Sequence, residues 1–231
     1  SLVLTIQSHS FHRSKVISSA NFLSGGVYES INGFSEYLTL QKQNEILANE
    51  NARLKSQLFN IKDSTLVPSI DSIKGVDKVN LIVSKVIHNS YNVYENYITI
   101  KGGAKDGIKP DMGVINSLGI IGIVDNTSEK YATVVSILNR KSQINAKIKK
   151  TNHFGSLIWD GKNTGFVQLI DVPRLAAIRK GDTIVTGGQS VIFPENINIG
   201  TIDKIYIDDQ TNYYTLNVKL FNDMTNLGHV Y

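Results

Sequence analysis

Ser190, His88 and Asp106 are the residues whose types could form a nucleophilic catalytic site. Such a site needs a serine in a glycine-rich loop that stabilises an oxyanion, a histidine that acts as base and a carboxylate that orients the histidine. Ser190 lies in "TGGQSV", which lacks the Gly-Asp-Ser-Gly arrangement of chymotrypsin-like enzymes, and His88 lies inside an expected strand. Because the sequence context of a triad is missing, we predict no catalytic residue and no enzyme.

Metal and phosphate sites are also not expected. His9 and His12 in "HSFH" could share one face of a helix, but no clustered His, Asp or Glu completes a metal site. The glycine-rich "GGAKDGIK" lacks the Gly-Lys-Ser/Thr ending of a phosphate-binding loop. The chain has no cysteine, which excludes disulfides and zinc–thiolate sites. We therefore predict no cofactor.

A basic cluster surrounds one alternating segment, "NRKSQINAKIKK", in a chain of formal net charge +4. Its basic residues are Arg140, Lys141, Lys147, Lys149 and Lys150. One interpretation is the solvated rim of a strand. The other is a contact surface for an acidic protein or for anionic lipid headgroups. Nucleic acid is not an expected partner, because no stacking aromatic residues are interleaved with these lysines.

Leucines seven residues apart mark a helix that we expect over residues 27–62. Leu40, Leu47 and Leu54 recur in a polar stretch that contains no glycine or proline, which is typical of a coiled coil. Two asparagines in the seam would favour a parallel dimer in one register. The alternative is an amphipathic helix that lies on its own domain, but the apolar face is narrow. The predicted dimer interface is Tyr37, Leu40, Asn44, Leu47, Asn51, Leu54, Leu58 and Ile61.

The rest of the chain is expected to be mainly β. Residues 63–79 have the composition of a linker. From residue 80 onward, about a dozen short β-rich runs are separated by turn sequences, and no long amphipathic helix interrupts them. Two six-stranded-type β-barrels in tandem fit this pattern better than one barrel of twelve strands, because small barrels fill their interior with side chains. We assign residues 80–150 to the first barrel and 151–231 to the second, with the alternative that the C-terminal strand returns to the first barrel.

Residues 1–26 are expected to be a membrane-proximal segment. The first residue is serine, so we expect that something upstream has been removed. The apolar run "LVLTI" is too short to span a bilayer, which takes about 20 residues. It has the character of the last part of a membrane helix.

Two stretches carry a family resemblance. They are "GAKDGIKPDMGVINSLGIIGIV", residues 103–124, and "KGDTIVTGGQSVIFPENINIGTI", residues 180–202. In their order and position behind a coiled coil they resemble the MreC family of bacterial rod shape-determining proteins. The matching residues of the first are Gly103, Asp106, Gly107, Met112, Gly113, Val114, Gly119 and Gly122. Those of the second are Gly181, Asp182, Thr186, Gly188, Phe193, Pro194 and Gly200.

Two positions depart from the family pattern. Gly187 replaces a serine, and Asn196 replaces the glycine that follows Phe-Pro. Asparagine is enriched where φ is positive, so we expect this turn to survive. Gly107, Gly188 and Gly200 are expected to supply backbone angles or close approaches that side chains forbid, and Phe193 with Pro194 to plug a barrel end.

The resemblance implies a non-enzymatic scaffold of the cell-wall elongation machinery. Members of this family have one helix in the cytoplasmic membrane, dimerise through the coil and present two β-barrels in the periplasm or outside the cell. They bind the class B penicillin-binding transpeptidase and work with MreD, RodA and MreB, which also leaves room for assemblies larger than a dimer. An alternative function is a periplasmic adaptor subunit of an efflux or secretion assembly. Such adaptors usually carry a helical hairpin, whereas this chain shows one helical heptad run.

Overall fold

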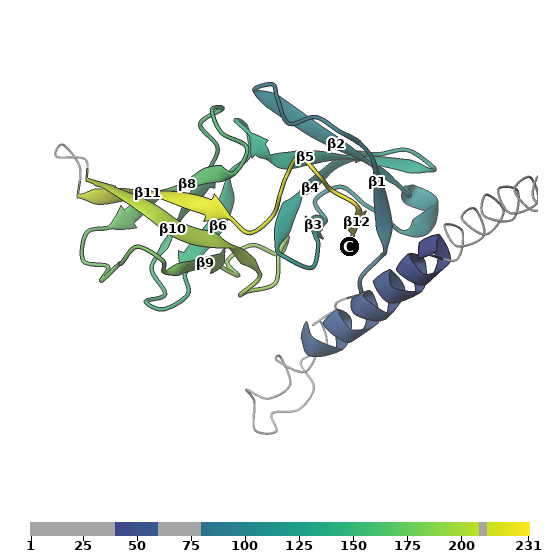
Figure 1. Cartoon of the computed structure of the whole chain (residues 1–231), viewed down its shortest axis with the longest axis horizontal. Coiled ribbons are helices and arrows are strands. Elements are labelled where there is room, and N and C mark those ends of the chain that lie inside the picture. Colours follow the sequence, from purple (N-terminus) through teal and green to yellow (C-terminus); the bar gives the residue numbers. More distant parts are fainter. Residues whose placement is uncertain (1–39, 60–79, 208–211) are drawn as a thin grey trace, which may run out of the picture. The chain divides into compact units, whose positions relative to one another are not determined.

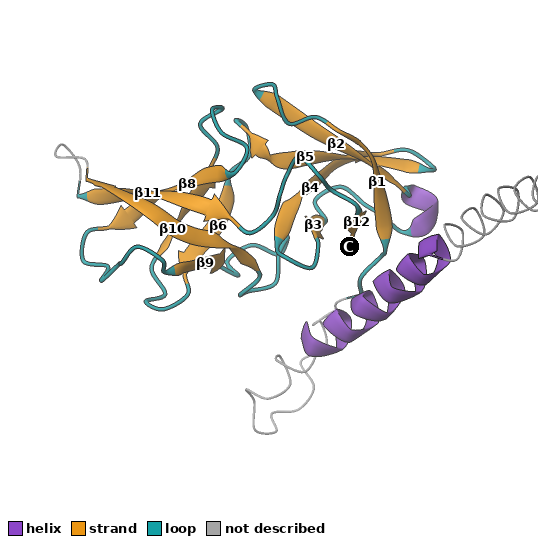
Figure 2. Ribbon diagram, viewed as in Figure 1, coloured by secondary structure: helices purple, strands orange, loops and turns teal. Residues whose placement is uncertain are grey.

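The computed structural model describes residues 40–59, 80–207 and 212–231. Apart from a helix over residues 40–59 and the short 3-10 helix η1 (Ala104–Asp106), the regular secondary structure of this part of the chain is β-strand (Figure 2). The twelve strands form two six-stranded antiparallel sheets. The prediction of a mainly β chain with two barrel-like sheets in tandem is therefore confirmed.

The first sheet takes strands from both ends of the described β region. Its order is β12-β1-β2-β5-β4-β3. These strands are β12 (His229–Val230), β1 (Ser84–Asn89), β2 (Glu95–Lys101), β5 (Tyr131–Asn139), β4 (Ile120–Thr127) and β3 (Gly113–Ile115). The final strand, yellow in Figure 1, lies among the teal strands of this sheet.

Backbone hydrogen bonds close the first sheet into a barrel. Ile115 at the end of β3 donates its N–H to the carbonyl of Tyr231 at 2.9 Å, and Tyr231 returns a bond of 2.8 Å. On its other side, β12 pairs with β1 through Ser84 opposite Val230. The last three residues thus bridge the two strands that would otherwise be the open edges of this sheet.

The second sheet is a closed barrel built from consecutive strands. Its order is β10-β11-β8-β7-β6-β9, and β9 pairs again with β10. The strands are β6 (Ile144–Ile148), β7 (Phe154–Ile158), β8 (Phe166–Pro173), β9 (Thr183–Thr186), β10 (Asn198–Ile207) and β11 (Tyr213–Leu220). The segment "DGKNTG", residues 160–165, joins β7 and β8 in an antiparallel hairpin. β10 and β11 also pair antiparallel.

The expected boundary between the barrels near residue 150 is wrong. β6 pairs with β7 and β9, so it belongs to the second barrel, and the division falls between Asn139 and Ile144. Alternation shows that one face of this strand is buried but not which sheet buries it.

Alternating side chains fill both barrels. Ile98, Val134 and Leu138 are fully buried in the first. In the second, Ile144, Ala146 and Ile148 share the inner face of β6, as their spacing predicts. This core orients the loops that meet at the junction of the barrels.

The helix over residues 40–59 covers part of the expected coiled coil. The rest of residues 27–62, including Tyr37 and Ile61, lies outside the described residues, as do the membrane-proximal segment 1–26 and the whole linker 63–79. The structure does not show a long coiled coil. Among the described residues, no helix combines the length and apolar character needed to cross a membrane.

Candidate functional site

The three residues considered for a triad have separate structural settings. Ser190 lies in the loop between β9 and β10, where its Oγ accepts a hydrogen bond from the N–H of Ile192 at 3.2 Å. His88 is exposed on β1. The Asp106 carboxylate accepts the N–H of Gly103 at 3.0 Å and so caps η1. Within the described ranges, no group of three or more His, Cys, Asp or Glu side chains is placed to hold a metal ion.

The β9–β10 loop (residues 187–197) is held at its base by Thr186. The Thr186 hydroxyl donates to the carbonyl of Pro194 at 2.6 Å and accepts the N–H of Ile197 at 2.9 Å. The N–H of Asn196 bonds to the carbonyl of Thr186 at 3.1 Å. Asn196 has φ of 68°, so the expected positive-φ turn at this position is confirmed.

The same loop packs against the first barrel. Phe193 is buried, and a Cβ on Gly113 in β3 would lie 2.6 Å from its ring and from the carbonyl oxygen of Ile192. A Cβ on Gly119 would lie only 2.2 Å from the carbonyl oxygen of Asn198. Gly113 and Gly119, two of the glycines of the first family stretch, therefore permit close approach of the second barrel.

The other turn positions of the two stretches also behave as expected. Gly107 and Gly188 have φ of 85° and 74°. Gly200 lies where a Cβ would be 2.1 Å from the carbonyl oxygen of Lys219. These residues make the fold rather than a ligand site.

A groove of about 1170 Å³ lies between the β9–β10 loop and the first barrel. Ile108, Met112 and Val114 line it from the first barrel, and Gln189, Val191 and Ile192 from the loop. The position of the loop therefore sets the shape of the groove.

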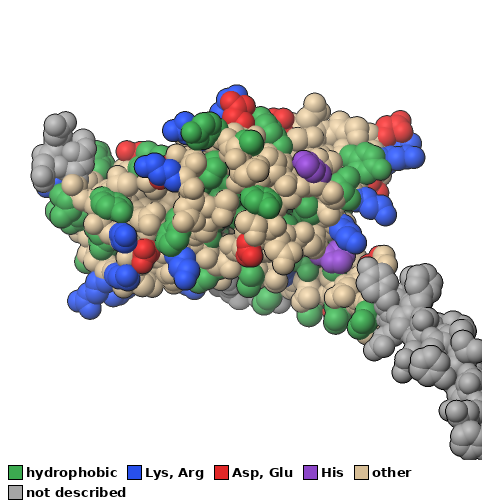
Figure 3. All heavy atoms as spheres, turned by 45° about the horizontal axis from the view of Figure 1, so that its top comes forward, with side chains coloured by type: hydrophobic (Ala, Val, Ile, Leu, Met, Phe, Trp, Pro, Cys, Tyr) green, Lys and Arg blue, Asp and Glu red, His purple; other side chains and the backbone are tan. Residues whose placement is uncertain are grey.

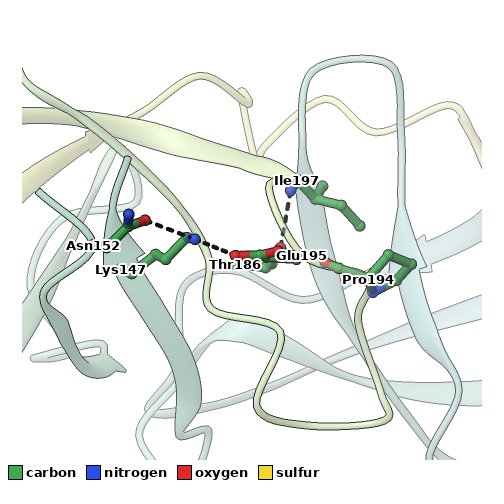
Figure 4. A network of polar contacts seen from close by, with 6 residues as sticks. All are labelled: Lys147, Asn152, Thr186, Pro194, Glu195 and Ile197. Atoms are coloured by element: carbon green, nitrogen blue, oxygen red, sulfur yellow. Dashed lines mark hydrogen bonds and ion pairs between the residues drawn. The ribbon is translucent and has the colours of Figure 1, made fainter. Parts of the chain in front are cut away.

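Lys147 corrects the interpretation of the basic cluster. Its side chain is only 6% exposed, because the β9–β10 loop covers the outer face of β6. The ammonium group forms an ion pair with Glu195 and donates to Oδ1 of Asn152 at 3.0 Å (Figure 4). The loop therefore shields this lysine from a partner or a membrane.

The other basic residues of the cluster are exposed, unlike Lys147. The Arg140 guanidinium lies 4.7 Å from the centre of the Tyr94 ring. Lys141 pairs with Glu95 at 2.9 Å, and this hydrogen bond raises the pKa of the lysine. Lys149 and Lys150 follow the end of β6 and are exposed, unlike Lys147. Figure 3 shows lysine and arginine side chains spread over the surface in small groups.

On the helix, the described part of the predicted dimer interface is exposed in the single chain. Leu40, Leu47, Leu54 and Leu58 have exposed fractions of 51%, 59%, 44% and 59%. Asn44 and Asn51 of the same seam are exposed as well. This row of apolar side chains is a candidate interaction surface.

Comparison with known proteins decides the family. The family model "Rod shape-determining protein MreC, barrel core" matches residues 86–231, which include both barrels except the first two residues of β1. The chain belongs to the MreC family. It is 33% identical over 229 residues to the cell shape-determining protein MreC of Listeria monocytogenes, which covers 95% of this chain and 76% of that protein. The MreC of Bacillus subtilis is 24% identical over 220 residues, covering 89% of this chain and 75% of the relative.

The fold agrees with solved MreC structures. The structure of MreC from Listeria monocytogenes superposes with a TM-score of 0.63 at 31% identity, covering 82% of this chain and 90% of that one. The predicted family resemblance is therefore confirmed. The family model and the relatives are cell shape-determining proteins, so they do not support the alternative of an efflux or secretion adaptor.

Sequence reasoning missed the contact between the β9–β10 loop and β6. Lys147 and Glu195 are 48 residues apart in the chain. No periodicity links them, because an ion pair between a strand and a distant loop leaves no local pattern in the sequence. The only available signal was that a lysine stood between two buried residues of a strand.

Proposed function

We propose that this chain is a non-enzymatic, dimeric scaffold of the cell-wall elongation machinery. In this role it is tethered to the cytoplasmic membrane by a single helix upstream of residue 1, with the barrels in the periplasm or outside the cell. It binds and positions peptidoglycan synthases and so maintains rod shape. Membership of the MreC family supports this function, and the exposed leucine row of the helix carries the proposal of a dimer.

The dimer rests on the physical chemistry of the leucine row. Fully burying a leucine stabilises an assembly by roughly 1.5–3 kcal/mol relative to leaving it exposed. Leu40, Leu47 and Leu54 lie seven residues apart, so a second helix in parallel register would cover all three at once. Asn44 and Asn51 would pair with their own copies across the two-fold axis. The complete interface then includes Tyr37, Leu58 and Ile61.

A tethered dimer can bind a synthase through contacts that are individually weak. Holding a synthase near two copies of the barrels raises its effective concentration, so each contact can be weak. The proposed partners are the class B penicillin-binding transpeptidase, with MreD, RodA and MreB in the same machinery. The family resemblance supports these partners.

Light scattering tests the dimer. We expect the chain to have about twice its mass of 25.5 kDa in solution. Leu47→Asp with Leu54→Asp should reduce it to the monomer mass, because charges replace the seam. Lys42→Asp with Asn49→Asp, also seven residues apart but opposite the seam, should leave the dimer intact. A chain that begins at Asn80 should be a monomer.

Two different results would contradict two different parts of the proposal. Unchanged mass in the Leu47→Asp, Leu54→Asp variant would show that the seam is assigned wrongly. A monomer in every case would favour the helix lying on its own domain. Capture of the purified transpeptidase by the chain, measured separately, tests the scaffold role: no binding by either dimer or monomer would refute it.

The exposed basic residues remain a proposed contact with an acidic partner or anionic headgroups. Lys149 and Lys150 are its most accessible members, whereas Lys147 is not. Lys149→Glu with Lys150→Glu should weaken cosedimentation with vesicles containing anionic lipid, and Lys105→Glu serves as control. If both variants cosediment with the vesicles as well as the parent chain does, and transpeptidase binding is also unchanged, the proposed basic contact is refuted.

A further inference from the structure

We propose that Lys147 and Glu195 form an electrostatic latch that holds the β9–β10 loop closed and thereby sets the groove between the barrels. This inference is independent of the proposed function, because it concerns a conformational equilibrium of the chain itself. It rests on the burial of Lys147, on the contacts of the loop and on the unequal exposure of the two partners.

The neighbours of Lys147 make its cation dependent on the loop. On the adjacent strands Lys147 lies opposite Phe154 of β7 and Val185 of β9, both apolar. A buried ammonium group without partners is unfavourable. Asn152, on the same hairpin, supplies one neutral acceptor at 3.0 Å. Among the described residues, the acidic side chain that pairs with Lys147 is Glu195, which the loop brings over the strand (Figure 4).

The loop transmits this contact to the first barrel. Glu195 is adjacent to Pro194, whose carbonyl is fixed by Thr186, and to Phe193, which packs on Gly113. Gly188 lies against Glu195, where a Cβ would be 2.8 Å from the Cβ of the glutamate. The two ends of the loop are therefore drawn together beside the ion pair. Displacing Glu195 would move Phe193 and the groove wall.

The unequal exposure of the pair explains how it could open. The Glu195 side chain is 52% exposed and that of Lys147 only 6%. If the loop moves outward, water reaches both groups, so the latch can be released without leaving a buried charge. By contrast, the side chains of the Lys141–Glu95 pair are 68% and 50% exposed, so neither charge is buried, which makes this pair a matched control.

Hydrogen exchange tests the latch. In Glu195→Ala the closed loop would enclose an unpaired cation, so the amides of Ile192 and Asn196 should exchange at least about tenfold faster. Amides of the β7–β8 hairpin should be unchanged, as should the loop in Glu95→Ala. Adding Lys147→Met to Glu195→Ala should restore slow exchange, because an apolar side chain suits Phe154 and Val185.

That rescue distinguishes an electrostatic latch from ordinary packing by Glu195. If Glu195→Ala leaves the loop amides unchanged, or if the double variant exchanges as fast as Glu195→Ala, the latch is refuted. Equal acceleration throughout the second barrel would also refute it, because the pair would then contribute only global stability.

Spin labels test the link to the groove. Because the chain has no cysteine, Val191→Cys on the loop and Lys130→Cys on the first barrel can be labelled selectively. Val191 is fully exposed, so the label displaces no packing. We expect one narrow distance distribution in the parent chain and a broader, longer one in Glu195→Ala. An unchanged distribution would refute control of the groove by the latch.

Discussion

At the scale of single residues, Gly119 shows how closely the two barrels approach. A Cβ there would lie 2.2 Å from the carbonyl oxygen of Asn198, a backbone atom that cannot rotate away. Nearby, the buried Asn222 donates its side-chain N–H to the carbonyl of Ile120 at 3.0 Å. Backbone contact and a buried hydrogen bond therefore hold this junction together.

We expect Gly119→Ala to destabilise the chain by about 1–3 kcal/mol, the usual range for overpacking. Urea unfolding followed by fluorescence measures this change. Gly228→Ala is the matched control, since a Cβ there would meet no atom within 4 Å. Equal unfolding midpoints for the two variants would show that the barrels separate readily at this point.

At the scale of elements, the connector between β11 and β12 carries the chain from the second barrel back to the first. Asp223 in this connector accepts the Thr225 hydroxyl at 2.6 Å and the Thr225 N–H at 2.9 Å. The hydrogen bond from the hydroxyl, and then that from the backbone, lower the pKa of Asp223 below its ordinary value of 3.8. Asn89 also donates to the carbonyl of Met224 at 2.8 Å.

The lowered pKa of Asp223 predicts how its contribution to the free energy of unfolding changes with pH. Because the folded chain binds the Asp223 proton more weakly than the unfolded chain, the contribution to stability is present above the unfolded pKa. It is lost as the pH falls through the folded pKa. Thr225→Val should therefore lower the urea midpoint at pH 7, and the difference should shrink as the pH falls below 3.8. A difference independent of pH would show that Thr225 acts through packing.

At the scale of the whole molecule, the second barrel is built from one continuous segment of the chain and the first barrel is not. The second is complete within residues 144–220, whereas the first needs Ile115 and Tyr231 to meet at its seam. Loss of the last residues would expose the edges of β1 and β3. The C-terminus is thus part of the first barrel in structure although it follows the second in sequence.

We therefore expect a fragment of residues 142–222 to fold alone, with a cooperative unfolding transition and dispersed amide resonances. A fragment of residues 80–139 should remain unfolded or aggregate, because its sheet lacks β12. Adding residues 222–231 as a separate peptide should improve its solubility and order. A stable, monomeric 80–139 fragment would show that the closing strand is dispensable.

The sequence by itself determined the local features of this protein. Alternating apolar residues predicted the strands and their buried faces, heptad leucines predicted the helix, and the order of turn glycines, with Asn196 as a substitute, predicted the family. These signals are local, because residue spacing reports which side of an element is apolar.

Only the tertiary structure decided which segments lie together. It moved β6 to the second barrel, closed the first with the last residues and placed Lys147 beneath the β9–β10 loop. Alternation placed Lys147 on the outer face of its strand, but whether that face meets water or a loop from 48 residues away depends on the packing of the whole chain. Pairing between distant segments leaves no period in a single sequence.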